Sequence, residues 1–236
     1  MDKEQAENYI KAGKILQKTV EKAKKSIKPG QKLLEIALNI EKNIQGIGEG
    51  AGKLAFPVNL SINENAAHFT PSSQEEAVLK ASDVMKVDVG VHVDGFIADG
   101  AFTLNPDNSH ARMVEAAEKA LENALAIAKE GTQLGEIGSV IEKTIGEKGF
   151  NPVQNLTGHG LMQFEQHASP SIPNIARKDE RALEEGHAYA IEPFATDGKG
   201  FVREGQQSEI FSLDEPRPVR NEHARNILEF VVEKYQ

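Results

Sequence analysis

Two pairs of segments repeat along this chain, and this internal repeat constrains the fold more than any other feature. Residues 28–44 (KPGQKLLEIALNIEKNI) align without gaps with residues 129–145 (KEGTQLGEIGSVIEKTI) at an offset of 101, with nine of the 17 positions identical. Residues 79–90 align with residues 183–194 at an offset of 104, which places Glu192 on the position of Asp88. The order of elements repeats as well, so we expect two similar halves about a pseudo-two-fold axis, with equivalent inward-facing residues meeting near it.

Local patterns predict both helices and strands. Helical periodicity, turn residues and capping residues predict helices over residues 5–27, 31–44, 109–130 and 134–149, with Ser109 as an N-cap and Gly131 just after a helix end. Strands are expected at FPVNLS from residue 56, at NPVQNLT from residue 151 and at AYAIEPF from residue 188. Together with the hairpin described next, this mixture predicts an α+β fold.

Residues 84–104 (VMKVDVGVHVDGFIADGAFTL) carry the clearest short-range signal. Apolar residues alternate on both sides of Asp94-Gly95, a dipeptide typical of a two-residue type I′ turn between antiparallel strands. Counting outward from that turn pairs Gly90 with Asp99, so Asp88, Gly90 and Asp99 share one face of the sheet. We expect the two carboxylates to converge across the space that Gly90 leaves empty. Two acids brought together repel each other, and a metal cation would compensate, whereas a single such acid would more often be solvated.

Composition limits the classes of function. The 236 residues, 39% of them hydrophobic, can bury one large core or two small ones, and the net charge of −9 argues against nucleic-acid or membrane-surface partners. The chain has no cysteine, so any metal must be held by oxygen and imidazole ligands. No apolar run approaches the ~20 residues of a membrane span, and the start MDKEQAENY lacks the features of a signal peptide. We therefore expect a cytoplasmic protein.

Three of the seven histidines stand out by their context. His159 lies between two glycines at a strand end, where the backbone can expose the ring, and this suits a ligand. His167 follows eight residues later in an expected loop, and His68 precedes a turn. A lone loop histidine is more often solvated than functional, and that interpretation is kept for the remaining four, which are His92, His110, His187 and His223.

Five ordered motifs carry a family resemblance along the whole chain. FPVNLSINENAAHFTP, KVDVGVHVDGFIAD, NLTGHGL with a later QH, SIPN and YAIEPFAT occur in that order. They resemble the archaeal type II methionine aminopeptidases, which have the pita-bread fold. The resemblance implies two internally duplicated halves, a central antiparallel sheet and outer helices. It also implies a cytoplasmic monomer that acts on nascent polypeptide N-termini, possibly near the ribosome, without direct contact with nucleic acid or membrane.

The same resemblance implies a metal site. By motif, Asp88 would chelate one of two divalent ions (Co, Mn, Fe or Zn), Asp99 would bridge both, and His159 with Glu192 would hold the other. His68 and His167 match the family histidines that contact substrate, and Glu192 would also move a proton to the leaving amine. The ions would activate a shared water and polarise the scissile carbonyl. Phe56 and Phe194 are candidates to line an apolar pocket for the methionine side chain.

The chain departs from the family pattern near its end. The family has a fifth ligand, a bridging Glu on a late strand beyond a helical insertion, and residues 217–236 resemble only the first helix of that insertion. Glu209 is a weak substitute, because its neighbours match a different strand of the family. We therefore expect a chain that lacks a C-terminal segment and binds divalent metal weakly or at one of the two sites. One domain over 1–236 is expected, with halves at about 1–108 and 109–214.

Two other functions stay open on the sequence. One is a catalytically inactive binding protein of the ribosome-associated pita-bread type, and the other is a dipeptidase acting on Xaa-Pro, which shares the metal ligands. The four ligands and two histidines favour an enzyme over the binding protein. The segment around FPVNLSINENAAHFTP resembles the methionine enzymes more than the Xaa-Pro enzymes.

Overall fold

The computed structural model describes residues 1–236 except 206–207, 209, 214–216 and 236. The expected substitute ligand Glu209 and the boundary expected near residue 214 therefore lie outside the described residues. In chain order the elements are α1 (Lys3–Ser26), α2 (Leu33–Ile47), β1 (Lys53–Ile62), β2 (Met85–Val93), β3 (Phe96–Leu104), α3 (Ala111–Ile127), α4 (Leu134–Glu147), β4 (Asn151–Pro152), β5 (Gly158–Met162), β6 (Glu165–Ile172), β7 (Ala188–Ala190), β8 (Ala195–Thr196) and α5 (Glu222–Tyr235).

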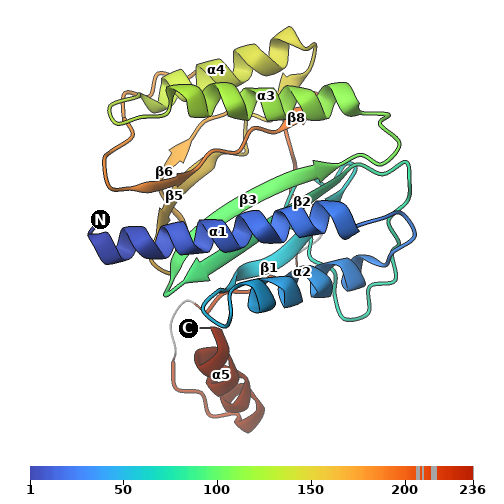
Figure 1. Cartoon of the computed structure of the whole chain (residues 1–236), viewed down its shortest axis with the longest axis vertical. Helices are drawn as coiled ribbons and strands as arrows, with labels where there is room; N and C mark the ends of the chain where they lie inside the picture. Colours follow the sequence, from blue (N-terminus) through green and yellow to red (C-terminus); the bar gives the residue numbers. More distant parts are fainter. Residues whose placement is uncertain (206–207, 209, 214–216, 236) are drawn as a thin grey trace.

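The first half of the chain is a three-stranded antiparallel sheet in the order β1-β2-β3, covered by α1 and α2 on one face (Figure 1). The covered face is apolar because alternate residues of β1 and β2 turn toward the helices. Val58, Leu60, Val87 and Val89 are fully buried there. At ~25 cal/mol per Å² of apolar surface, this burial is the main stabilising contribution of the half. The other face of the sheet carries the acids Asp88 and Asp99.

The second half pairs α3 with α4 and contains two small sheets, β6-β5-β7 and β4-β8 (Figure 1). Its core is separate and is built largely from one face of α4, with Leu134, Ile137, Ile141 and Ile145 fully buried. A third, smaller cluster of Ile97, Leu161 and Ala190 joins β3 of the first half to β5 and β7 of the second.

Equivalent hydrogen bonds in the two halves confirm the internal repeat. The amide of Gly30 donates to the carbonyl of Leu79 (2.8 Å), and the amide of Gly131 donates to that of Leu183 (2.9 Å). The helix that follows each turn is held in the same way, because Leu33 donates to Ala77 (2.9 Å) and Leu134 donates to Arg181 (2.8 Å). The donors differ by 101 residues and the acceptors by 104, which are the two offsets of the sequence alignment.

The β2–β3 hairpin has the expected register. Val93 pairs with Phe96, Gly90 with Asp99, and Asp88 with Ala101. Asp94 and Gly95 both have positive φ, at 51° and 82°, as a type I′ turn requires.

Several local expectations are wrong. Helix α3 begins at Ala111 with His110, not Ser109, at the N-cap position, and no side chain caps it. The Ser109 hydroxyl donates to Asp107 Oδ1 (2.6 Å). His167 lies in strand β6 and not in a loop. His92 is buried rather than solvated, with 9% of its surface exposed.

The second-half strands are also shorter than expected. The segment from residue 151 contributes only Asn151–Pro152, and AYAIEPF contributes only Ala188–Ala190. Glu192 therefore lies just beyond a strand. No helix among the described residues is long and apolar enough to cross a membrane. The segment from residue 217 does form a helix, α5.

Candidate metal centre

Asp88 and Asp99 come together on the sheet face opposite α1 and α2, because β2 and β3 pair in the register set by their turn. The two carboxyl groups are close enough that the charge of Asp99 adds to the effect of burial in raising the pKa of Asp88. The space beside them is not empty, contrary to expectation. The Phe56 ring of β1 lies over Gly90, where any Cβ would collide with it, so Phe56 forms an apolar floor next to the acids.

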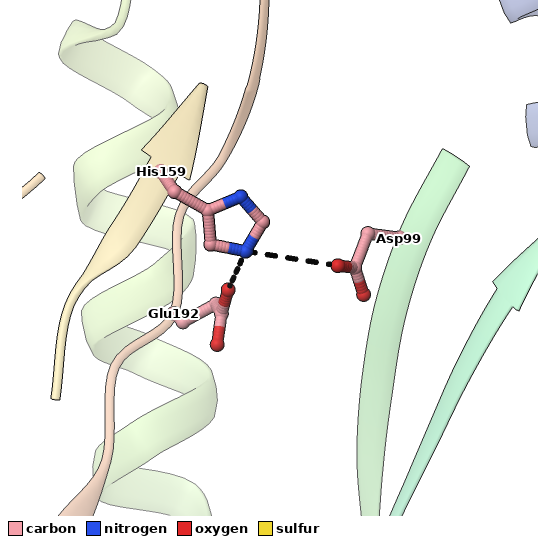
Figure 2. A group of neighbouring side chains, drawn as sticks. All are labelled: Asp99, His159 and Glu192. Atoms are coloured by element: carbon pink, nitrogen blue, oxygen red, sulfur yellow. Dashed lines mark ion pairs between the residues drawn. The ribbon is translucent and has the colours of Figure 1, made fainter. Parts of the chain in front are cut away.

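Two further side chains reach this face from the second half. His159 projects from β5, and Glu192 projects from the segment after β7 (Figure 2). The Nε2 atom of His159 lies 2.9 Å from Glu192 Oε1 and 3.7 Å from Asp99 Oδ2. One ligand atom from each of Asp99, His159 and Glu192 lies within 4.8 Å of the other two, so the three donors can contact one ion. Asp88 extends the group, because it lies on the same sheet face as Asp99.

The backbone of β5 sets the orientation of the His159 ring. Nδ1 lies 3.0 Å from the carbonyl oxygen of Gly160. Since a carbonyl oxygen only accepts, Nδ1 carries the proton. Nε2 donates to Glu192 only when the ring is protonated, and in the neutral ring its lone pair is available to a cation. A histidine whose second nitrogen is held by a backbone carbonyl is the usual form of a metal-bound imidazole.

The electrostatics of the cluster favour the uptake of positive charge. Burial, followed by the charges of Asp99 and Glu192, raises the pKa of Asp88 well above its usual range. Burial and the charge of Glu192 raise the pKa of Asp99 to about 6. Burial lowers the pKa of His159. The hydrogen bond to Glu192, the Gly160 carbonyl and the charge of Asp99 together outweigh that effect, so the net pKa is raised. Asp88 and Asp99 resist ionisation because both are buried and a further carboxylate lies close to them.

This donor set fits a divalent cation. Three carboxylates and one imidazole are the ligands that Mn, Fe, Co and Zn accept in proteins. The pKa values of Asp88 and Asp99 are raised, so without a metal these carboxyl groups take up protons. A metal ion would supply the neutralising positive charge instead. A bound cation would reverse both shifts, because it favours the ionised carboxylates.

The substrate histidines implied by the resemblance lie in a row beside His159. The ring of His167 meets the ring of His159 edge-on at 4.6 Å between centroids, and the His68 ring follows at 6.2 Å from His167. His68 has a positive φ of 62°, so the backbone bends at this residue. Burial and the two neighbouring histidines lower the pKa of His167, so its ring is neutral at neutral pH.

The two candidate pocket residues are placed differently. Phe56 packs on Gly90 beside the acids, as described above. Phe194 is half-buried two residues after Glu192, and its carbonyl accepts a hydrogen bond from the Val153 amide (2.9 Å). The structure therefore brings Phe56, and not the Phe194 ring, into demonstrated contact with the acidic face.

Two residues that support the site were missed at the sequence level. Gln166 donates from Nε2 to Asp99 Oδ2 (3.3 Å), across the two halves. Asn174 donates from Nδ2 to the carbonyls of Glu192 (2.8 Å) and Leu156 (2.9 Å), which fixes the segment carrying Glu192. Asn174 belongs to the SIPN motif and Gln166 to the QH motif, and those positions were the available signals. Neither motif indicated the partner, which for Gln166 lies 67 residues away.

Comparisons with known proteins agree with this geometry. A family model described as metallopeptidase family M24 matches residues 7–223. The methionine aminopeptidase of Archaeoglobus fulgidus is 49% identical over 237 aligned residues, covering 100% of this chain and 80% of that protein. The crystal structure of a methionine aminopeptidase from Thermotoga maritima superposes with a TM-score of 0.77 at 28% identity, over 91% of this chain and 89% of the other.

A prolidase from Pyrococcus furiosus also shares the fold, with a TM-score of 0.69 at 26% identity, over 81% of this chain and 56% of the prolidase. The chain belongs to metallopeptidase family M24 and has its pita-bread fold. Within that family, its high identity over the full length is to the archaeal methionine aminopeptidases.

Proposed function

We propose that this chain is a metal-dependent aminopeptidase that removes the N-terminal methionine from newly made polypeptides. The observation that carries this proposal is the 49% identity to an archaeal methionine aminopeptidase across the whole chain. The clustering of Asp99, His159 and Glu192 supports it. The cytoplasm, where polypeptide N-termini emerge, is the proposed location.

The proposed cofactor is a pair of divalent ions drawn from Mn, Fe, Co and Zn. Asp88 and Asp99 would hold one ion, and Asp99 with His159 and Glu192 would hold the other. The placement of the two aspartates on one sheet face and the 4.8 Å grouping of Asp99, His159 and Glu192 support this division. When bound, such ions supply an activated water and an electrophile for the peptide carbonyl.

The remaining steps belong to the side chains. Glu192 lies at the edge of the cluster with 33% of its side chain exposed, so it can receive a proton and deliver it to the leaving amine. His167 is neutral and therefore has one ring N–H that can donate to the carbonyl oxygen as negative charge develops there. His68 stands next to it and can contact the same substrate group. Phe56, on the floor of the site, is the proposed wall of the methionine pocket, and Phe194 is a second candidate.

The alternative functions are less well supported. An Xaa-Pro dipeptidase would use the same metal donors, but identity to the prolidase is 26%, against 49% for the methionine enzyme. An inactive binding protein would have no need to retain four donors and two histidines in one cluster.

The decisive experiment is a substrate comparison with the purified chain. We expect free methionine to be released from Met-Gly-Met-Met in the presence of Mn²⁺ or Co²⁺, with no cleavage of Ala-Pro. Cleavage of Ala-Pro alone would establish the dipeptidase. A folded, metal-loaded chain that cleaves neither peptide would favour the binding protein.

The number of bound metal ions, the oligomeric state and the contact with ribosomes need separate measurements. Elemental analysis of the purified protein counts the divalent ions bound per chain and so tests whether one or both of the proposed positions fill. Light scattering should give the mass of a monomer. Co-sedimentation with ribosomes tests the proposed action on nascent chains at their source.

Substitution of two histidines separates metal binding from substrate contact. We expect His159→Ala to lose both metal and activity, because Nε2 is a proposed ligand. His167→Ala should keep its metal and lose ~10²–10³ in turnover, the usual cost of removing one oxyanion donor. Calorimetric titration with Mn²⁺ and a methionine-release assay would measure the two effects, and equal metal loss in both variants would contradict the assignment.

A further inference from the structure

The tips of two hairpins from opposite halves lie against each other. The turn between β5 and β6 contains Gln163 and Phe164, and the turn between β2 and β3 contains Asp94 and Gly95. The Phe164 amide donates to the Gly95 carbonyl (2.8 Å), and Gln163 Nε2 donates to the Asp94 carbonyl (2.8 Å). We call these four residues, with His92, the inter-hairpin contact.

The inter-hairpin contact depends on the absence of a side chain at Gly95. The Phe164 ring lies where a side chain on Gly95 would project, so any Cβ there would meet the ring. The ring also meets the edge of His92 at 5.7 Å between centroids. The absence of a side chain at Gly95 therefore serves two purposes, since its φ of 82° suits the turn and its bare surface receives Phe164.

Phe164 itself adopts an unfavourable conformation. Its φ is 59°, a region that bulky residues seldom occupy, and 60% of its surface is exposed. Such a conformation costs on the order of 1–3 kcal/mol and persists where surrounding contacts compensate. An exposed, strained aromatic that contributes little to a core is consistent with a role in joining the two hairpins.

His92 supports the receiving turn from inside. Its Nδ1 accepts a hydrogen bond from the Gly95 amide (3.0 Å), and 9% of the residue is exposed. The ring therefore holds the Asp94-Gly95 turn in the conformation that Phe164 covers. This explains why His92 is buried, although no role in the cluster of metal donors is assigned to it.

The two hairpins also carry the ligands. Asp99 lies on β3, four residues after Gly95, and His159 lies on β5, four residues before Gln163. The 3.7 Å distance between His159 Nε2 and Asp99 Oδ2 is set by how the two halves dock, because β3 and β5 are not consecutive in the chain. A second link at the same end is Tyr9, whose hydroxyl donates to the Leu161 carbonyl (3.0 Å) and whose ring packs edge-on against Phe96.

We propose that Gln163 and Phe164 are positioning residues whose contact with the Asp94-Gly95 turn holds Asp99 and His159 at the separation that metal binding needs. The proposal rests on the metal site put forward above and adds to it a support outside the cluster. Replacing a residue that orients a metal ligand typically weakens metal binding 10–100-fold. We expect an effect of that size here, although the contact lies away from the ligand atoms.

The test is calorimetric titration of Mn²⁺ into the full chain and three variants. Phe164→Gly removes the ring without retaining the strained backbone, Gln163→Ala removes one hydrogen bond, and Phe164→Leu keeps an apolar side chain. We expect Kd to rise at least about tenfold in Phe164→Gly, by less in Gln163→Ala, and to recover partly in Phe164→Leu. Met162→Ala is the control, because Met162 is 54% exposed on the same hairpin and should leave Kd unchanged.

Thermal unfolding of each metal-free variant separates positioning from stability. A purely structural role would lower Tm and leave the Mn²⁺ affinity of the folded protein at the parental value, and that result would overturn the proposal. If Phe164→Gly does not fold, Gln163→Ala decides, since it removes one hydrogen bond from a surface turn. A parent chain that binds no Mn²⁺ would overturn the metal site itself, whereas parental binding unchanged in all variants would overturn only the positioning role.

Discussion

Two aspartates five residues apart on one hairpin, Asp94 and Asp99, should respond differently to the same substitution. Asp99 accepts from Gln166 and lies 3.7 Å from His159, whereas Asp94 occupies the first position of the turn at a φ of 51°. We expect Asp99→Asn to weaken Mn²⁺ binding by at least about tenfold, since a neutral amide replaces a charged ligand. Asp94→Asn should bind normally, because Asn suits a type I′ turn. Equal affinities in a calorimetric titration would contradict the assigned register.

Gly90 shows how a single missing side chain shapes the site. A Cβ at this position would collide with the Phe56 ring, so Gly90→Ala should displace the ring and destabilise the protein by about 1–3 kcal/mol, the usual cost of overpacking. Gly13→Ala in α1 is the matched control, because no atom lies within 4 Å of a Cβ there. Replacing a helical glycine at an open position should stabilise the fold by about 0.5–1 kcal/mol.

Urea unfolding would measure both glycine variants. Opposite signs of the change in unfolding free energy are expected, and a Gly90→Ala protein as stable as the parent would mean that the Phe56 ring can move aside at little cost. In that case Phe56 would be a poor candidate for a rigid pocket wall.

At the scale of elements, Asn174 ties together two segments that carry ligands. It is 1% exposed, and its amide donates to the carbonyl that precedes β5 and to the carbonyl of Glu192. Asn174→Ala would leave two carbonyls without these donors, at about 1–3 kcal/mol for each buried group. We expect a loss of several kcal/mol in urea unfolding and weaker Mn²⁺ binding.

Asn155→Ala provides the comparison for Asn174. Asn155 also makes two hydrogen bonds, both with the backbone of Val202, but it is exposed, so water can replace them. A loss as large as that of Asn174→Ala would show that burial does not account for the difference.

Elements differed in how well local sequence predicted them. The β2–β3 hairpin was predicted residue by residue, because a two-residue turn with positive φ at both positions fixes the register of its strands. The strands at residues 151 and 188 were predicted too long, since strand length is set by how many partners the neighbouring strands offer. Ser109 was a wrong N-cap because α3 begins one residue later, with His110 at the N-cap position and no side-chain capping hydrogen bond.

At the scale of the whole molecule, the acidic cluster should make stability depend on pH and on metal. Burial and Glu192 raise the pKa of Asp99 from its usual value of 3.8 to about 6 in the folded chain, so between these values the folded state binds more protons than the unfolded state. Stability of the metal-free protein should therefore fall as pH rises from about 4 to above 6. The expected contribution is on the order of 1–3 kcal/mol.

Chemical unfolding in the presence of a chelator would measure this dependence. Asp99→Asn should show a smaller loss over the same pH range, because the neutral amide does not titrate. Addition of Mn²⁺ should reverse the trend and stabilise the parent more at pH 7 than at pH 5, since the metal binds the ionised carboxylates. A parent whose stability rises steadily from pH 4 to pH 7 in chelator would contradict the clustering of the acids.

The sequence by itself determined the duplicated plan and the hairpin register, and it predicted the donors of the acidic cluster, because repeats, turn chemistry and residue type are local properties of the chain. Only the tertiary structure decided how the halves dock, and with it the 2.9 Å contact of His159 with Glu192 and the placement of Phe56 in the space beside Gly90. The contacts of Gln166, Asn174 and Phe164 were also invisible in sequence. Each joins segments that are distant in the chain, and the energy of such contacts exists only once both cores have formed.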